Sequence, residues 1–429
     1  MLSWLKISIP ILAIGGFFIF VYNYWQTIDI EQGSKPLPEL VIEKLETGEE
    51  NLESSEDPVV QSLSLEVQKL TAEVQQFIED INEARVKSSQ VKGIYLNEFV
   101  ANSQTPWAKA YREKIKTMLE ETELNGVVID VKEAYGPDLP SSLEGFIQEL
   151  HQKDVWVIAR ICAFRDSSLK EEKPEWYLKD TLATSSDNIW YDPGGVAWLD
   201  PAGAEVQQYI VDFSKKAIDF GFDELQFDYV RFPSDGNLKN IVYPFYDAKA
   251  EKYEVIGGFF AKLSQDLREY KPSIILSADL FGYLATQFQS FDIGQRLFDA
   301  GKFLDYVSFI LYPSHFYSGF MVDYDAQREL PALNFPYEAA DITTVTPNNP
   351  YPVILRSVLS SIDYLSAYGL AAKVRPWLQD FNLNYDVNRG IIYDAEKVKV
   401  QIQGAEDGGA SGWLLWNSAN IYTVGALTF

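Results

Sequence analysis

The chain has 429 residues, of which 47% are hydrophobic and 14% aromatic, and its formal net charge is −26. A chain of this length and composition can bury at least one large core, which excludes wholesale disorder. The charge argues against a nucleic-acid partner, because such binding relies on Lys and Arg side chains that neutralise phosphates. A neutral carbohydrate polymer meets no such repulsion. One cysteine excludes an intrachain disulfide, and two histidines exclude a His-rich metal site.

An almost wholly apolar segment lies near the N-terminus, at residues 7–22. Flanking apolar residues bring it close to the roughly 20 residues needed to span a bilayer. Lys6 precedes the segment, whereas Asp29 and Glu31 follow it, and this asymmetry predicts a cytoplasmic tip and an exported remainder. No small-x-small cleavage site follows. We therefore expect an uncleaved, single-pass anchor in the cell membrane over residues 1–28, with the rest of the chain on the extracytoplasmic side.

A polar linker and a helix are expected next. Residues 29–60 are acidic, contain Ser and Pro, and lack periodic apolar positions, which indicates a solvated linker. Over residues 61–88 the apolar positions alternate in spacings of four and three, which predicts a helix with a heptad stripe formed by Leu63, Val67, Leu70, Val74, Phe77 and Ile81. Residues 63–81 either pair two copies of the chain as a coiled coil or form one amphipathic helix packed on the next domain.

From residue 91 to 429 short β-rich runs alternate with amphipathic stretches, which is typical of parallel βαβ units. Eight runs begin at Val91, Gly126, Val155, Glu224, Ile274, Tyr306, Lys373 and Gly412. Helical stretches are expected at residues 108–121, 204–220, 246–270 and 357–368. Eight strands close a (β/α)8 TIM barrel, and the long connections after the third and sixth strands are expected to shape a substrate cleft. Pro376 cannot donate to a ladder, so the seventh strand begins late or carries a bulge.

Active sites of such barrels lie at the C-terminal ends of the strands. Period-two alternation places Asp228 on the barrel-facing side of the fourth run, Asp279 on that of the fifth, and Asp130 together with Lys132 on that of the second. Three strands thus direct a carboxylate toward one opening. Buried carboxylates are costly unless they are paired, so the alternative is a set of structural ion pairs, Asp228 with Arg231 and Asp130 with Lys132.

Carboxylates in this position fit glycoside hydrolysis. An oxocarbenium-like transition state requires one carboxylate to stabilise or trap the sugar and one protonated acid for the leaving oxygen, and it requires no metal or organic cofactor. The motifs of competing chemistries, GxSxG, GxxxxGK[ST] and HExxH, are absent from the sequence.

The segment LQFDYVRFP, residues 225–233, closely resembles the signature of the family known as "putative glycosyl hydrolase domain". The flanking landmarks KGIYLN, VVIDVK, WLDP, SADLFG and RPWLQDF also resemble that family, so the resemblance covers roughly residues 91–425. It implies a TIM barrel distantly similar to those of alpha-amylases and alpha-galactosidases, whose nucleophile is an aspartate that ends strand four. Asp228 matches that position. Two positions depart from the amylase pattern, which has a glutamate acid where this chain has Asp279 and an arginine where it has Gln226.

These observations together predict a membrane-anchored, retaining glycoside hydrolase that acts on a polysaccharide or cell-envelope glycan. Asp228 is the expected nucleophile and Asp279 the leading acid/base, with Asp130 and Asp380 as substitutes. Arg231 or Lys132 would hold Asp228 ionised. Substrate-binding candidates are Lys132, Arg160, Arg231, Tyr312, Trp377, Gln379, Trp416 and Asn417. The alternative is a non-catalytic glycan-binding or envelope-scaffold barrel, because fold does not imply function.

Overall fold

The computed structural model describes residues 58–183, 187–288 and 291–427, and the chain divides into two compact units at residues 1–78 and 79–429. Helix α3 (Pro58–Ser88) begins in the first unit and ends in the second, which confirms a helix where the heptad stripe predicts one. The expected membrane anchor at residues 1–28 lies outside the described residues. Within the described ranges, no helix is both long enough and apolar enough to cross a membrane.

The heptad stripe is only partly visible. The side chains of Leu63, Val67 and Leu70 lie outside the described ones, Phe77 is 41% exposed, and Ile81 is buried. Pairing of two copies through residues 63–81 stays a prediction.

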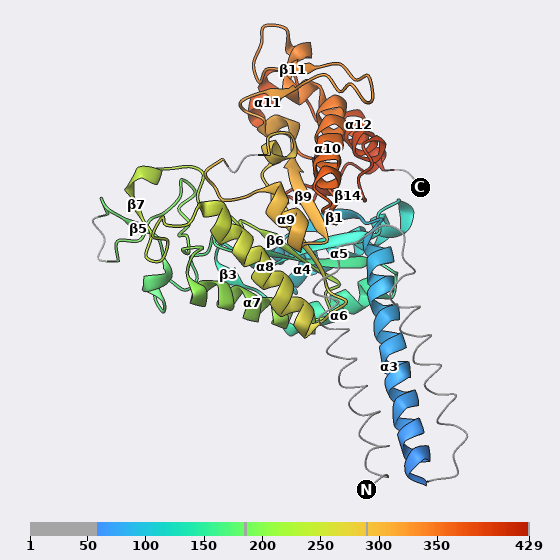
Figure 1. The fold of residues 1–429 in the computed structure, drawn as a ribbon. Coiled ribbons are helices and arrows are strands. Elements are labelled where there is room, and N and C mark those ends of the chain that lie inside the picture. Colours follow the sequence, from blue (N-terminus) through green and yellow to red (C-terminus); the bar gives the residue numbers. More distant parts are fainter. Residues whose placement is uncertain (1–57, 184–186, 289–290, 428–429) are drawn as a thin grey trace. The chain divides into compact units, whose positions relative to one another are not determined.

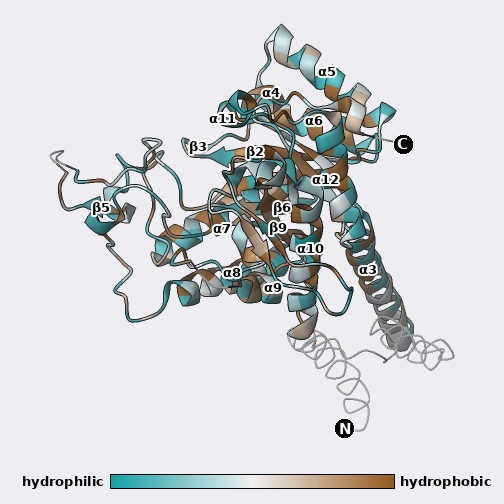
Figure 2. Ribbon diagram, turned by 90° about the horizontal axis from the view of Figure 1, so that it is seen from above, coloured by the Kyte–Doolittle hydropathy of each residue, from teal (hydrophilic) through white to brown (hydrophobic). Residues whose placement is uncertain are grey.

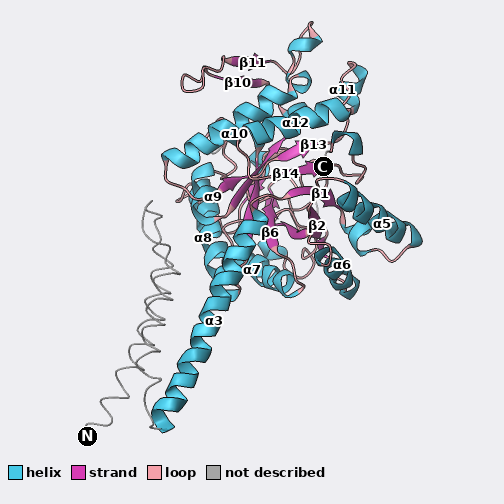
Figure 3. Cartoon of the chain, turned by 90° about the vertical axis from the view of Figure 1, so that its right-hand side faces the viewer, coloured by secondary structure: helices cyan, strands magenta, loops and turns pink. Residues whose placement is uncertain are grey.

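Eight parallel strands form a closed barrel, as predicted (Figures 1 and 3). Each strand pairs with the next, and the last returns to pair with the first, so the barrel has no free edge. The strands in barrel order are β1 (Lys92–Leu96), β2 (Gly126–Glu133), β4 (Trp156–Cys162), β6 (Glu224–Asp228), β8 (Ile275–Leu280), β9 (Tyr306–Leu311), β13 (Trp377–Gln379) and β14 (Trp413–Trp416).

The seventh strand is interrupted at Pro376, where the sequence predicts a late start or a bulge. A short β12 (Lys373–Val374) pairs with β9 before the proline, and β13 continues after it. The register on β9 is the same on both sides, with Val374 opposite Val307 and Trp377 opposite Ile310. Pro376 still accepts a hydrogen bond from the amide of Leu414 at 2.9 Å. The interruption therefore follows from the missing N–H of proline and not from an extra residue.

Helices cover the outside of the barrel, and the core lies between the two layers. In Figure 2 the central strands are coloured mainly as hydrophobic. The four predicted helices are present, although the third starts six residues later and the fourth seven residues earlier than expected. The helices are α4 (Glu98–Asn102), α5 (Pro106–Glu121), α6 (Ser141–His151), α7 (Ala204–Asp219), α8 (Lys252–Tyr270), α9 (Leu297–Phe303), α10 (Pro350–Ala367), α11 (Asn384–Asn388) and α12 (Ala395–Asp407).

Long connections leave the C-terminal ends of several strands. Those after β4 and β9 match the two long connections predicted from the sequence, and a third follows β6. The connections after β4, β6 and β9 contain the short strands β5 (Lys179–Asp180), β7 (Ile241–Val242), β10 (Phe320–Val322) and β11 (Leu333–Phe335), whereas β3 (Gly136–Pro137) follows β2. β5 pairs with β7, which joins the connections after β4 and β6, and β10 pairs with β11 within the connection after β9. Their position makes them the walls of any site at this end of the barrel.

The last turns of α3 close the opposite, N-terminal end of the barrel. The carbonyl of Ser88 accepts from Nη2 of Arg375 at 3.2 Å, and its hydroxyl lies 3.0 Å from that of Tyr306. Arg375 in turn forms a fully buried ion pair with Glu224, the first residue of β6, at 2.9 Å. The compact unit that contains the barrel comprises residues 79–429, so it includes this end of α3.

This arrangement predicts that a chain of residues 91–429 is less stable than a chain of residues 79–429. Removing Ser88 leaves a buried donor of Arg375 without its acceptor, which costs about 1–3 kcal/mol. It also exposes the N-terminal end of the barrel interior to water. Urea unfolding of the two chains measures the difference. Equal free energies of unfolding would contradict a structural role for residues 79–90.

Candidate active site

One arginine lies at the centre of the C-terminal end of the barrel. Arg160 of β4 is 4% exposed, and its Nη1 donates to Oδ1 of Asp130 at 2.6 Å and also to the carboxylate of Glu133. Its Nη2 donates to the carboxylate of Asp228, and its Nε lies 3.6 Å from Oδ2 of Asp279. A single guanidinium thus contacts four carboxylates. Asp130, Asp228 and Asp279, which the sequence directs toward one opening, thus lie together around Arg160.

The expected partner of Asp130, Lys132, lies elsewhere. A β-bulge between Asp130 and Lys132 shifts the register of β2 against β4, so the period-two alternation fails at this point. The ammonium of Lys132 donates to the carbonyl of Cys162 at 2.6 Å and pairs with Asp166 at 2.8 Å, and it lies near the ring of Tyr209 on α7. The prediction that Asp130 and Lys132 share a face is therefore wrong. Lys132 and Asp166 form a fully buried structural ion pair.

The cation that pairs with Asp228 also differs from the one that the sequence predicts. The guanidinium of Arg231 lies over the rings of Trp198 and Tyr229, at 5.1 Å from each, and donates to the carbonyl of Phe232 and the hydroxyl of Ser234. It makes no ion pair with Asp228, because the chain turns directly after β6. The predicted pairing of Asp228 with Arg231 or Lys132 is replaced by the pairing with Arg160.

Asp228 is held at both oxygens. It is the last residue of β6, and Oδ1 accepts from the backbone amide of Tyr229 at 2.6 Å while Oδ2 accepts from Arg160. Tyr229 has φ = +51°, a left-handed conformation that a bulky residue rarely adopts. Such strain persists only where surrounding contacts impose it, and it concentrates at functional sites. Here it turns the chain sharply, so that the carboxylate of Asp228 is presented at the strand end.

Asp279 of β8 lies beside Asp228 in a drier environment. It is 2% exposed, and Oδ1 accepts from the indole Nε1 of Trp377 at 2.8 Å. Burial, together with the negative charge of Asp228, raises the pKa of Asp279 well above its ordinary value, although Arg160 opposes this. Two neighbouring carboxyl groups in unlike environments are the usual basis for one to act as a charged group and the other as an acid.

Asp130 and its neighbours hold Arg160 in place. The hydroxyl of Tyr95 donates to Oδ2 of Asp130, and Arg160 occupies Oδ1, so both oxygens are engaged. Burial raises the pKa of Asp130 to about 7 against the opposing charge of Arg160. The ring of Trp416 stacks on Tyr95 with centroids 4.0 Å apart and lies 5.1 Å from the guanidinium. These groups hold the arginine in place, and Asp130 does not line the cavity beside Asp228 and Asp279.

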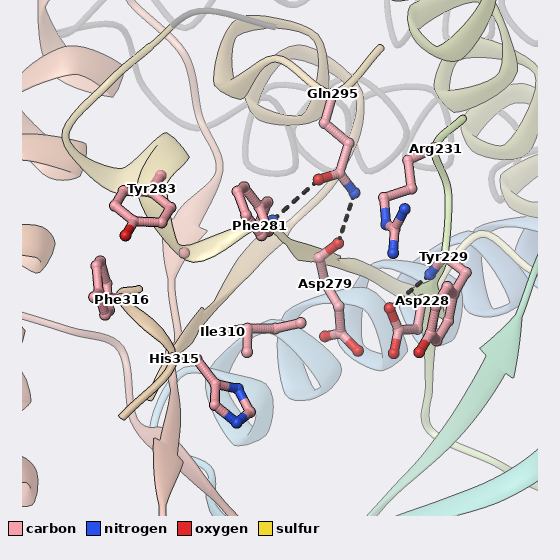
Figure 4. A pocket seen from close by; sticks show the side chains of 11 residues that line it. Asp228, Tyr229, Arg231, Asp279, Phe281, Tyr283, Gln295, Ile310, His315 and Phe316 are labelled. Carbon is pink, nitrogen blue, oxygen red and sulfur yellow. Dashed lines mark hydrogen bonds between the residues drawn. The ribbon is translucent and has the colours of Figure 1, made fainter. Parts of the chain in front are cut away.

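A cavity of about 190 Å³ opens beside the two remaining carboxylates. Asp228 and Asp279 line it together with Arg231, and in Figure 4 the side chains of Tyr283, His315 and Phe316 lie on one side of this pair. The sequence analysis missed two of the other lining residues. Gln295 donates to the carbonyl of Asp279 and accepts from the amide of Phe281, both at 3.0 Å, and His315 has a pKa that burial lowers. Gln295 stands on a loop and His315 in a short 3-10 helix, where no strand periodicity points to them.

The remaining candidates do not line this cavity. Tyr312 is buried and packs edge-on against His315, with ring centroids 5.3 Å apart. Both oxygens of Asp380 accept from Thr423, and the amide of Asn417 donates to the carbonyl of Asp380. Gln379 binds the backbone and hydroxyl of Ser314 with its side-chain amide. Asp380, Gln379 and Asn417 thus secure the loops after β13 and β14. Among the residues that the structure describes, no group of His, Cys, Asp or Glu is arranged to hold a metal ion.

The raised pKa of Asp279 predicts how stability changes with pH. The folded protein binds this proton more tightly than the unfolded chain, whose aspartates titrate near pH 4. The contribution is therefore complete below about pH 4 and is lost as pH rises through the folded pKa. Asp279→Asn carries no titrating group, so it should gain stability relative to wild type between pH 5 and 8. Urea unfolding across this range measures the gain. If the free energies of unfolding of the two proteins changed in parallel with pH, the raised pKa of Asp279 would be contradicted.

Comparison with known proteins identifies the family. A family model described as "Putative glycosyl hydrolase domain" matches residues 138–422, which is more than half of the chain. The chain belongs to this family. The resemblance seen in the sequence is thereby confirmed, and membership supports a glycosidase as the class of enzyme. No curated protein matches the chain.

A solved structure shows the same fold. The PgaB (BpsB) glycoside hydrolase domain from Bordetella bronchiseptica is 12% identical, with a TM-score of 0.54 over 77% of this chain and 95% of that one. At this identity the likeness shows the shared barrel. An alpha-galactosidase from Thermus thermophilus is 14% identical, with a TM-score of 0.45 over 77% of this chain and 58% of that one. A hypothetical protein from Ruminiclostridium thermocellum is 28% identical, with a TM-score of 0.36 over 43% and 96%.

Proposed function

We propose that this protein is a retaining glycoside hydrolase in which Asp228 is the nucleophile and Asp279 the acid/base. The observation that carries the proposal is that both carboxyl groups line one cavity and contact one guanidinium, yet have unlike environments. Asp228 is paired with Arg160 and with a backbone amide, whereas the pKa of Asp279 is raised by burial and by Asp228 itself. A two-carboxylate mechanism requires this difference, because one group acts as a charged nucleophile and the other as a protonated acid.

In the first step an oxygen of Asp228 attacks the anomeric carbon while Asp279 transfers its proton to the glycosidic oxygen, which leaves as an alcohol. The product is an ester between the sugar and Asp228. In the second step Asp279, now a carboxylate, takes a proton from water as the water oxygen attacks the anomeric carbon and releases Asp228. The esterified Asp228 is neutral, so one cause of the raised pKa of Asp279 disappears, and this favours its second role as a base.

The proposed substrate is a neutral carbohydrate polymer at the cell envelope. A net charge of −26 disfavours polyanions. The apolar segment at residues 7–22 would anchor the chain in the membrane by a single span, with the barrel on the extracytoplasmic side, where such polymers are found.

The acid/base assignment can be tested with leaving groups. Dinitrophenyl glycosides need no proton on the leaving oxygen, whereas alkyl glycosides do. Asp279→Asn should therefore slow the cleavage of alkyl glycosides by about 10²- to 10⁴-fold and slow the first step on dinitrophenyl glycosides far less. Steady-state and burst kinetics on a panel of sugars measure both. Asp380→Asn, with melting curves, is the comparison, because Asp380 is a strand-end aspartate outside the cavity.

Two outcomes would count against this proposal. An equal loss of rate on both leaving groups in folded Asp279→Asn would remove it as the acid. The absence of cleavage on every sugar of the panel would favour the non-catalytic glycan-binding barrel.

A further inference from the structure

Aromatic side chains, some exposed and some partly buried, lead away from the cavity on one side. Four of them, His315, Tyr317, Tyr337 and Tyr385, form what we call the aromatic track. His315 ends the short 3-10 helix η4 (Pro313–His315) and lines the cavity itself. Tyr317 is 62% exposed and Tyr385 is 46% exposed. Exposed aromatic rings gathered in one place are uncommon on a soluble surface unless they bind something.

The aromatic track is continuous. The rings of His315 and Tyr317 are stacked with centroids 5.8 Å apart and an interplanar angle of 24°. Tyr317 meets Tyr337 at 5.1 Å, and Tyr337 stacks on Tyr385 at 5.8 Å with an angle of only 11°. These residues come from the connection after β9, the segment after β11 and helix α11. Parts of the chain distant in sequence thus build one line of rings that starts at the cavity.

The far end of the aromatic track is held rigidly. The guanidinium of Arg389 lies 5.0 Å from the ring of Tyr337 and 4.4 Å from that of Tyr385. It donates to the carbonyl of Tyr337 at 2.9 Å and to the buried carboxylate of Asp386. The rings are therefore fixed before any ligand arrives, which reduces the ordering cost of binding.

We propose that the aromatic track binds consecutive sugar residues of a neutral polysaccharide whose cleavage point lies in the cavity. This inference rests on the proposed function and adds the surface along which the polymer binds. The faces of pyranose rings carry C–H groups that pack on aromatic rings, while their hydroxyls stay in water. Successive aromatic rings at regular intervals suit a repeating chain. The pKa of His315 is lowered by burial, so its ring is an uncharged platform at neutral pH.

Polymer binding can be measured without cleavage, so it tests the aromatic track separately from catalysis. The background is full-length Asp228→Asn, which should not degrade the ligand. Native gels containing soluble starch, galactomannan, xyloglucan or hydroxyethylcellulose serve as probes. At least one polymer should retard the protein, and Tyr317→Ala and Tyr385→Ala should each weaken that retardation about tenfold. Tyr324→Ala is the matched control, because Tyr324 is 58% exposed and lies outside the aromatic track.

Each possible result either supports or overturns the proposal. Loss of retardation in Tyr317→Ala and Tyr385→Ala with normal retardation in Tyr324→Ala supports the proposal. No retardation of the parent by any of the four polymers, or equal effects in all three variants, overturns it. A change from dimer to monomer in Tyr317→Ala during sedimentation, without a change in retardation, would assign the surface to contact between copies and also overturn it. Cleavage of short aryl glycosides tests the proposed function independently, because such substrates do not reach Tyr385.

Discussion

Asp228→Asn should lower the turnover of the full-length protein by about a thousandfold or more, which corresponds to at least about 4 kcal/mol of transition-state stabilisation. Asparagine keeps the size and shape of the side chain but removes the charge and the nucleophilic oxygen. The fold should survive, because Arg160 keeps Asp130 and Glu133 as partners when the charge of Asp228 is removed. The measurement is kcat on any glycoside that the wild type cleaves, together with a thermal melt of each protein.

The size of this effect separates catalysis from positioning. A residue that only orients the sugar contributes a few hydrogen bonds, so its loss costs far less than three powers of ten. Asp247→Asn serves as the control, because Asp247 is exposed, pairs only with its near neighbour Lys249, and lies away from the cavity. Activity within tenfold of wild type in a folded Asp228→Asn protein would remove Asp228 as the nucleophile.

The sequence predicted the fold and the convergence of the acids because both follow from local periodicity. Alternating β-rich and amphipathic runs indicated eight strands, and the period of two assigned Asp130, Asp228 and Asp279 to the barrel interior. The same period failed at Lys132, where one extra residue in β2 changes which face a side chain occupies. A bulge depends on the fit between neighbouring strands, and no pattern within a single strand records it.

The choice of ion-pair partners was beyond the sequence for a related reason. Arg160 was predicted as a substrate-binding residue, yet it pairs with the candidate nucleophile. It stands directly opposite Gln226 in the register of β4 on β6. Gln226 carries no charge, and the neighbouring strand supplies the cation for Asp228. Which residues face each other across two strands depends on register, which a single sequence does not give.

Arg160→Met should be the most destabilising single change at this end of the barrel. It keeps an unbranched side chain of similar length but removes the charge that contacts Asp130, Glu133, Asp228 and Asp279. Removing one partner of a buried ion pair leaves an uncompensated charge and costs about 3–5 kcal/mol. We expect a loss of at least this size at pH 7, measured by urea unfolding. Activity should fall with it, because Asp228 loses the group that holds it in place.

The loss should shrink as the pH falls. Without the guanidinium, a charge that lowers the pKa values of Asp130 and Asp279 is gone, so these groups take up protons more readily in the variant, and protonation removes uncompensated charge. Adding Asp130→Asn to Arg160→Met should restore part of the stability for the same reason. Arg231→Met is the matched control, because Arg231 lines the cavity but makes no carboxylate contact, and its loss should cost less than about 1 kcal/mol. The contrary outcome is that Arg160→Met is no more destabilising than Arg231→Met at pH 7. The ion pairs of Arg160 with the four carboxylates would then not stabilise the fold, and the proposed roles of Asp228 and Asp279 would lose their electrostatic basis.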